Sequence, residues 1–255
     1  MRLLFFYLAL VPIIFPQSPT APHGIIGTPT AGGGGTTFTV VETVGTAATT
    51  TAACVTSGVT LTFGTATTSG EAIFVAWEEE SAGGTTAITD SASDSYTKDW
   101  ELTAFVSHQS TGLAHFFNVA SGVTTVTVTG AASNTHCVAA ATHVKRSSGS
   151  WAVDQTGAAS NTSVNGSPWA GPTSGITTTA NNEVLIGEAG IHGSGDCSVA
   201  ASGNWVQAYG NYDNNGYAMQ LSYQKVSSIQ TAIQNTGTTT VCTSPNAAPG
   251  LVSYK

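Results

Sequence analysis

The sequence predicts an all-β protein, a single antiparallel β-sandwich of jelly-roll-like form with long loops rich in Ser, Thr, Gly and Asn. Three observations predict this fold class. β-Branched Thr and Val dominate where a helix would carry Leu, Glu and Lys. No stretch of helical length places apolar residues at helical spacing. Short apolar segments recur roughly every 8 to 15 residues between clusters of Gly, Ser, Asn and Asp, which is the spacing of a sandwich.

The expected strands are of two kinds. Alternation of apolar and polar residues is typical of strands with one buried face, and it occurs at residues 38–41, 59–63 and 123–129. The last segment contains one irregularity that we interpret as a β-bulge. Residues 72–77 and 184–187 are apolar on both faces, so we expect central strands there. Further strands are expected at residues 105–106, 114–119, 138–144, 219–223 and 251–254.

The N-terminal 21 residues have the pattern of a signal peptide. Arg2 precedes an apolar run from Leu3 to Phe15, shorter than the roughly 20 residues of a membrane-spanning helix. An uncleaved anchor is the alternative. Residues 22–36 contain four consecutive glycines and are expected to form a flexible lead. We therefore expect a secreted protein, extracellular or at the cell surface, that does not associate with membranes once the signal is removed.

Residues 37–255 are expected to form one domain. The pattern weakens at residues 157–179, where Ser, Asn, Gly and Pro interrupt it. A boundary there would leave two halves with too few expected strands for each to close a sandwich. One β-sandwich domain is therefore the favoured interpretation.

The charge composition limits the possible partners. Only 8% of the residues are charged, against roughly 25% in an average soluble domain, so hydroxyl groups must cover much of the surface. The formal net charge is −8, and no basic stripe is present. These features argue against nucleic acid and anionic membranes as partners.

Four cysteines are present and none forms a C-x-x-C pair, so zinc-ribbon and thioredoxin-like sites have no support. Two disulfides are the expected outcome in an oxidising compartment. Three pairings are possible. We favour Cys54 with Cys137 and Cys197 with Cys242, because the last two lie in loop-like contexts.

Several segments together carry a resemblance to known proteins. They are Trp77 followed by acidic residues, ITDSASDSYT (88–97), ASGVTTVTVT (120–129), VDQT (153–156) and NEVLIG (182–187). In this order they resemble a family of secreted bacterial β-sandwich proteins that are mostly uncharacterised. The resemblance covers residues 38–254 and implies an extracellular or cell-surface sandwich without an assigned catalytic site. The four cysteines and residues 195–205 depart from that pattern, so the resemblance says nothing about disulfide pairing.

A calcium site is one interpretation of the acidic residues. Asp90 and Asp94 lie in an expected turn, and Glu80 follows the preceding central strand. Calcium binds six to eight oxygen ligands, which these two stretches could supply if they were neighbours. The alternative is that Asp90 and its serine neighbours stabilise a turn through local hydrogen bonds.

The histidines give weaker signals for metal binding. His136 and His143 are separated by an odd number of residues, so a regular strand would place them on opposite faces. His192 with Asp196 and Cys197 could form a site, but a disulfide would remove the thiolate. Solvated loop residues are the favoured interpretation there.

A secreted hydrolase is the third functional hypothesis. Glycosidases need two carboxylates about 5 to 9.5 Å apart in a cleft. Glu183 with Glu188, or Asp99 with Glu101, could be spaced in this way. No nucleophile motif accompanies them, so a non-catalytic protein is the favoured interpretation.

Carbohydrate binding is the second hypothesis. Aromatic rings beside amide and carboxylate groups suit sugars, because the ring stacks on C–H surfaces while the polar groups bind hydroxyls. The candidate residues are Trp169, Tyr209, Tyr212 and Asn214. The alternative is that the tryptophans fill the core. The sequons at Asn161 and Asn165 could carry glycans in a suitable host.

The first hypothesis is a structural or adhesive protein that associates with itself. Long Thr/Val strands with few charges lack the lysines that normally block pairing at sheet edges. A strand within residues 36–44, behind the four glycines, could also add to a neighbouring molecule's sheet, or it could be the first strand of its own domain. The expected partners are therefore a second copy of the chain or extracellular glycans.

Overall fold

A computed structural model describes residues 35–48, 50, 52–80, 83–103, 106, 109–131, 136–158, 168–195, 197–212, 216–240 and 243–255. Gly35–Lys255 form one compact unit. The elements in this part of the chain are β1 (Phe38–Ala48), a short helical turn η1 (Ala52–Thr56), β2 (Val59–Thr62), β3 (Ala72–Glu79), β4 (Thr85–Asp90), β5 (Thr97–Thr103), β6 (Ser110–Phe117), β7 (Thr125–Gly130), β8 (Cys137–Arg146), β9 (Val153–Gly157), β10 (Trp169–Ile176), β11 (Glu183–Ser194), β12 (Ser198–Ala201), β13 (Val206–Tyr212), β14 (Tyr217–Val226), β15 (Ile233–Thr240) and β16 (Thr243–Tyr254).

The strands form two sets with the same topology. In the first set, a five-stranded sheet has the order β1-β8-β3-β6-β5 and a three-stranded sheet has the order β2-β7-β4. In the second set, the orders are β9-β16-β11-β14-β13 and β10-β15-β12, which are the same orders advanced by eight strands. All strand pairs are antiparallel, and each set is a jelly-roll-like sandwich. We call residues 38–146 repeat 1 and residues 153–254 repeat 2.

The repeats also match in register. The first strand of each carries a bulge at the corresponding position, which leaves Val41 as the extra residue in β1 and Asp154 as the extra residue in β9. The third strand pairs with the last so that Ala72 faces Val144 in repeat 1 and Val184 faces Tyr254 in repeat 2. Positions in the two repeats can therefore be equated residue by residue near this end.

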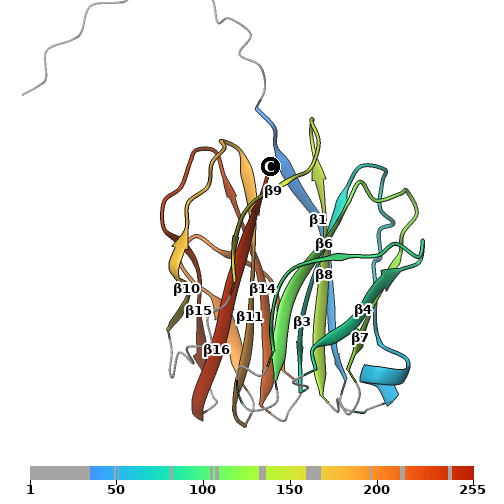
Figure 1. Cartoon of the computed structure of the whole chain (residues 1–255), viewed down its shortest axis with the longest axis vertical. Coiled ribbons are helices and arrows are strands. Elements are labelled where there is room, and N and C mark those ends of the chain that lie inside the picture. Colours follow the sequence, from blue (N-terminus) through green and yellow to red (C-terminus); the bar gives the residue numbers. More distant parts are fainter. Residues whose placement is uncertain are drawn as a thin grey trace, which may run out of the picture. The chain divides into compact units, whose positions relative to one another are not determined.

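The two five-stranded sheets pack face to face. Phe74 of β3 and Ile186 of β11 lie in one shared core, together with Trp151 and Tyr254. Ile73, Val75 and Trp77 alternate with the residues of the shared core along β3. They point the other way, into a second core beneath β2-β7-β4. Smaller cores lie in repeat 2 beneath β10-β15-β12. The strands thus form four layers, with the three-stranded sheets outermost (Figure 1).

The layered packing explains which strand predictions succeeded. The all-β antiparallel sandwich is confirmed, and β3 and the first half of β11 are buried on both faces, as the continuous apolar runs predicted. The structure contains seven strands, among the described residues, that were not predicted. They are β4, β5, β9, β10, β12, β13 and β15; most are rich in Thr, Gly, Asn or Gln, whereas β5 (TKDWELT) carries three charged residues and β12 (SVAA) has only four residues. With these strands included, each repeat has eight strands, which is more than the sequence analysis expected for either half of the chain.

Two local predictions were wrong. The irregularity at residues 123–124 is not a bulge, since β7 begins at Thr125 and pairs with β2 without a register shift. Instead Val123 exchanges hydrogen bonds with Thr67 ahead of the strand. Val106 lies in a bend and not in a strand, and residue 105 lies outside the described residues. The signal peptide and residues 22–34 of the expected lead also lie outside them.

None of the helices in the described part of the chain has both the length and the apolar character that a membrane crossing requires.

Candidate functional site

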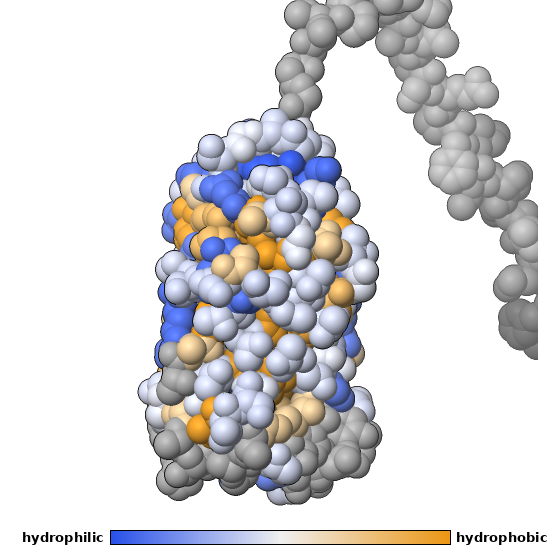
Figure 2. Space-filling model, turned by 90° about the vertical axis from the view of Figure 1, so that its right-hand side faces the viewer, coloured by the Kyte–Doolittle hydropathy of each residue, from blue (hydrophilic) through white to orange (hydrophobic). Residues whose placement is uncertain are grey.

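The outer face of the β2-β7-β4 sheet is covered by threonines. Thr60, Thr127 and Thr89 lie side by side across the three strands, and Thr62 and Thr125 form the neighbouring row. Their alternating partners point inward and are buried. Figure 2 shows this side of the molecule as mostly pale, with few strongly hydrophilic residues. The expectation that hydroxyl groups replace ions holds for this face.

Strand β2 forms an edge of this sheet. The N–H of Phe63 donates to the carbonyl of Thr124 at 2.8 Å, in register with the β2–β7 pairs. Hydrogen-bonded and non-hydrogen-bonded pairs alternate in an antiparallel ladder. Leu61 and Val59 therefore bond to β7, whereas Thr60 and Thr62 direct their N–H and C=O groups away from it. These groups are available to another strand.

A hollow of about 380 Å³ adjoins the edge. It lies between β1 and β2, two strands on the same side of repeat 1 that belong to different sheets. Its lining consists of Val44, Gly45, Thr46, Thr60, Leu61 and Thr62. None of these side chains is charged, and β2 contains no proline, lysine or bulge. Charged side chains, proline and bulges are among the features that usually prevent pairing at a sheet edge.

A buried polar contact joins the two repeats inside the central core. The hydroxyl of Thr111 lies 2.5 Å from Oε1 of Glu188 and 2.9 Å from the carbonyl oxygen of Trp77. Glu188 is fully buried, and burial raises its pKa well above the usual value. A hydroxyl has one proton to donate. A protonated Glu188 that donates to Thr111, while Thr111 donates to Trp77, satisfies both contacts.

A second contact across the repeats involves Asp99, the extra residue at the bulge of β5. Its Oδ2 accepts a hydrogen bond from the Tyr254 hydroxyl at 2.6 Å, and its Oδ1 lies 2.8 Å from Nδ1 of His115. The Asp99 side chain is 2% exposed. Both repeats are thus anchored to one buried carboxylate.

A third polar cluster, inside repeat 1, surrounds His143. This fully buried histidine has its Nδ1 2.7 Å from Oε2 of Glu71 and its ring 4.8 Å from that of Phe63. Glu42 accepts N–H hydrogen bonds from Gly64 and the next residue, which lowers the pKa of Glu42. These contacts hold residues 63–71 against β1 and β8. His136 lies on the opposite side of the sheet, where its ring stacks on Tyr217 of repeat 2, as the odd spacing predicted.

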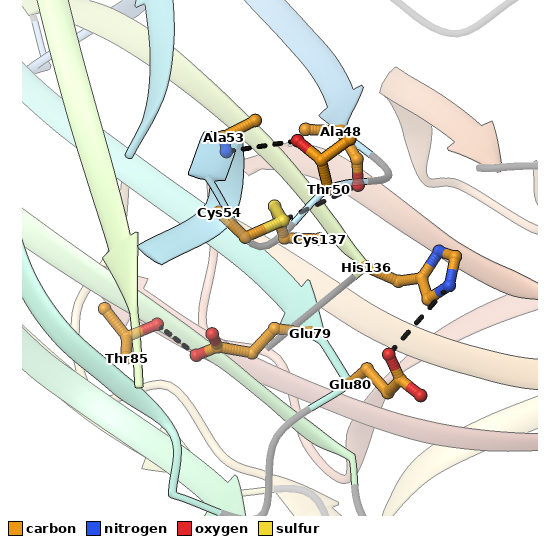
Figure 3. The surroundings of a disulfide bond; sticks show 9 residues. All are labelled: Ala48, Thr50, Ala53, Cys54, Glu79, Glu80, Thr85, His136 and Cys137. Carbon is orange, nitrogen blue, oxygen red and sulfur yellow. Dashed lines mark hydrogen bonds and ion pairs between the residues drawn. A yellow bond between two sulfur atoms is a disulfide. The ribbon is translucent and has the colours of Figure 1, made fainter. Parts of the chain in front are cut away.

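The predicted disulfide between Cys54 and Cys137 is confirmed. It links the turn that follows β1 to the start of β8, across 83 residues of sequence (Figure 3). Glu79 and Thr85 lie close to it and share a hydrogen bond of 2.7 Å. Cys197 is buried and also disulfide-bonded. Its predicted partner, Cys242, lies outside the described residues.

The structure separates the residues predicted to bind calcium. Glu80 follows β3 in the five-stranded sheet, whereas Asp90 ends β4 in the three-stranded sheet. Asp90 accepts hydrogen bonds from the N–H groups of Ala92 and Asp94 and from the hydroxyl of Tyr96. These contacts match the alternative interpretation, a turn stabilised by local bonds. Within the described residues, no group of three or more His, Cys, Asp or Glu side chains could hold a metal ion.

Of the four residues predicted to bind glycans, the structure describes the side chains of Trp169 and Tyr209. Trp169 is 1% exposed and lies in a core of repeat 2, and Tyr209 is half-buried, with its ring against Gly45 of β1. Tyr212 ends β13, and its side chain, like Asn214 and the sequons at Asn161 and Asn165, lies outside the described residues. Glycan binding by these residues stays a prediction.

The carboxylate pairs considered for a hydrolase lie apart. Glu183 and Glu188 are five positions apart in β11, so they face opposite sides of the sheet. Asp99 contacts Tyr254 of repeat 2, whereas Glu101 accepts the N–H of Thr85 in β4. The two carboxyl groups of each pair thus contact different parts of the molecule.

The sequence reasoning did not identify the ion pair between Lys255 and Asp154. Nζ of Lys255 lies 2.6 Å from Oδ1 of Asp154, beside the buried Glu183. A lysine at the end of an apolar strand was the only signal, and its partner lies 101 residues away.

The comparisons with known proteins found no relative: no family model, curated protein or solved structure matches the chain.

Proposed function

We propose that the protein is a secreted, non-catalytic structural or adhesive component that associates with a second copy of itself through the edge of β2. The observation that carries this proposal is the unprotected edge at Thr60 and Thr62, beside an uncharged hollow and a threonine face. An edge with free backbone groups and no protecting charge or proline is a template for strand pairing.

A two-fold arrangement fits this edge. Antiparallel pairing of β2 with β2 of a second molecule, centred on Leu61, places Thr60 of one molecule opposite Thr62 of the other. Both residues have outward backbone groups, so each pair can exchange two hydrogen bonds. The two three-stranded sheets would join into one six-stranded sheet with a continuous threonine face.

Two features support a location outside the cell. Disulfides persist in oxidising compartments, and the Cys54–Cys137 bond lies within repeat 1. Only 8% of the residues are charged.

The test compares the purified protein with Thr60→Pro and Thr60→Val. Proline removes the outward N–H and places its ring at the edge, but it leaves the β2–β7 hydrogen bonds in place. Valine keeps the N–H and favours a strand. Sedimentation velocity and negative-stain electron microscopy measure assembly, and thermal unfolding measures the fold.

We expect dimers of the wild type and of Thr60→Val, and monomers of Thr60→Pro with a nearly unchanged melting temperature. Monomeric wild-type protein over the full concentration range would overturn self-association. If Thr60→Pro is destabilised, the second variant Thr62→Lys, which places a charge on the same edge, decides the question. Assemblies that survive both changes would exclude this edge.

A further inference from the structure

Three ionisable side chains lie in a row on one face of the second five-stranded sheet. They are Asp154 of β9, Lys255 directly after β16, and Glu183 of β11, which come from three neighbouring strands in the order β9-β16-β11. Nζ of Lys255 is 2.6 Å from Oδ1 of Asp154. The Asp154 side chain is 1% exposed and Glu183 is fully buried, whereas Lys255 is 43% exposed.

The strand register brings these residues together. The pairing of Val184 with Tyr254 places Glu183 opposite Lys255. The bulge of β9 makes Asp154 the extra residue on the other side. Lys255 and Ala152 exchange two backbone hydrogen bonds of 2.8 and 2.9 Å. The backbone of the lysine is therefore held by the sheet, and its side chain has little distance to cover.

Hydrogen-bond donors surround the Asp154 carboxyl group. Oδ2 accepts the N–H of Thr179 at 2.7 Å, and Oδ1 is contacted by the Thr179 hydroxyl as well as by Lys255. Although burial raises the pKa of Asp154, the hydrogen bonds from Lys255 and Thr179 lower it overall. The unreacted pair is thus an ion pair with two fixed donors on the carboxyl oxygens.

The pKa of the Glu183 carboxyl group is shifted in the opposite direction from that of Asp154. Its Oε1 accepts the N–H of Ala180 at 2.8 Å, and its Oε2 has no hydrogen-bond partner among the described residues. Burial, followed by the nearby Asp154 carboxylate, raises the pKa of Glu183. A buried carboxyl group with a raised pKa, beside an amine and a carboxylate, can accept and return a proton during a reaction between them.

We propose that Lys255 and Asp154 form an intramolecular amide bond, with Glu183 as the group that moves protons. The ammonium passes one proton to the carboxylate across their hydrogen bond, and the neutral Nζ attacks Cγ of Asp154. The Nζ–Cγ bond forms, and the Thr179 N–H stabilises the oxygen that becomes negative. Glu183 takes a proton from the nitrogen and passes it to the departing hydroxyl. The Cγ–O bond breaks, and one water leaves without oxidation or reduction.

Repeat 1 provides an internal comparison. The equivalent positions are Glu71 for Glu183, Lys145 for Lys255 and Val41 for Asp154. Lys145 is exposed, and Val41 has no carboxyl group. The acid and the lysine occur in both repeats, but only repeat 2 has a group that the amine can attack. The bond is therefore specific to repeat 2, and it does not depend on the self-association proposed above.

The bond would tie the first strand of repeat 2 to its last. Asp154 and Lys255 are 101 residues apart in sequence. In repeat 1 the disulfide between Cys54 and Cys137 makes a comparable link, from the end of the first strand to the start of the last. Such links stabilise a folded protein mainly by restricting its unfolded chain.

The test is mass spectrometry of the purified, reduced and denatured protein, followed by peptide mapping. We expect a measured mass that is one water lower than the mass calculated for the same reduced chain. Peptide mapping should give one branched peptide that joins Asp154 to Lys255. Lys145 should appear in a linear peptide. Lys255→Arg keeps a cation beside Asp154 but cannot form the bond, so it serves as the folded control and should show the full mass.

Two variants examine the chemistry. Asp154→Asn should form the same bond with loss of ammonia in place of water. Glu183→Gln should slow bond formation during refolding at least tenfold while circular dichroism stays unchanged. A full-mass wild-type protein with a linear peptide ending at Lys255 would overturn the proposal. An unchanged rate of bond formation in Glu183→Gln would show that Glu183 takes no part in the reaction.

Discussion

The hydroxyl of Tyr254 donates a 2.6 Å hydrogen bond to Oδ2 of Asp99, and this contact joins the last strand of repeat 2 to an edge strand of repeat 1. Tyr254 is fully buried, and its ring lies 4.5 Å from that of Phe74. Burial, followed by the Asp99 carboxylate, raises the pKa of Tyr254 well above the usual value. The tyrosine therefore stays protonated and acts only as a donor, so the contact depends on its hydroxyl group.

Tyr254→Phe is expected to destabilise the protein by about 1–3 kcal/mol, because it leaves one oxygen of a buried carboxylate without its donor while the ring packing is kept. Urea unfolding followed by tryptophan fluorescence measures this difference. Tyr223→Phe, a half-buried tyrosine at the same core, is the control and should change stability much less. Equal effects of the two substitutions would show that the Asp99 contact contributes little.

Glu188→Gln is expected to stabilise the protein at about pH 8 and to leave its stability nearly unchanged at about pH 4. The pKa of Glu188 is raised by burial, so the folded state holds this proton more tightly than the unfolded state. Stability therefore falls as the pH rises above the unfolded value of about 4.3 toward the folded value. Melting temperatures between these pH values measure the effect. If the melting temperatures of the two proteins change with pH in the same way, Glu188 is not protonated in the folded state.

Glu71→Gln is expected to have the opposite pH dependence. Burial raises the pKa of Glu71, but the hydrogen bonds from Thr68 and His143 outweigh it and lower the pKa overall. A lowered folded pKa stabilises the protein above the unfolded value of about 4.3, and this stability is lost as the pH falls through the folded value. The variant should be less stable near neutrality and should converge with the wild type in acid. Acid titration of unfolding tests this, and a constant difference at every pH would contradict it.

Removal of the disulfide by Cys54→Ala with Cys137→Ala is expected to cost about 4–5 kcal/mol, because the bond closes a loop of more than 80 residues in the unfolded chain. Guanidinium unfolding measures the loss. The wild type under reducing conditions is the comparison, although reduction also opens the disulfide of Cys197. A loss below about 1 kcal/mol would mean that the unfolded chain is already compact at this point.

The sequence predicted the fold class because the period-2 pattern of β2 and β7 and the apolar runs of β3 and β11 are local properties. Each reports how many faces of a strand are buried, and no distant residue is needed to interpret it. The exposed threonines of β2 and the turn at Asp90 could be predicted for the same reason. Strands such as β15, with the sequence IQNTGTTT, have little apolar signal, because their buried positions are occupied by Asn235, Gly237 and Thr239.

The sequence by itself determined the all-β class, the hydroxyl-rich surface and a set of cysteines from which Cys54 and Cys137 could be paired. Only the tertiary structure decided that the chain contains two jelly-roll-like repeats, that their five-stranded sheets bury one another, and that Asp99 meets Tyr254. It also decided that Asp154, Lys255 and Glu183 share one face. The physical reason is that strand order, register and bulges are set by hydrogen bonds between residues tens to a hundred positions apart, whereas periodicity records only the burial of each strand's own faces.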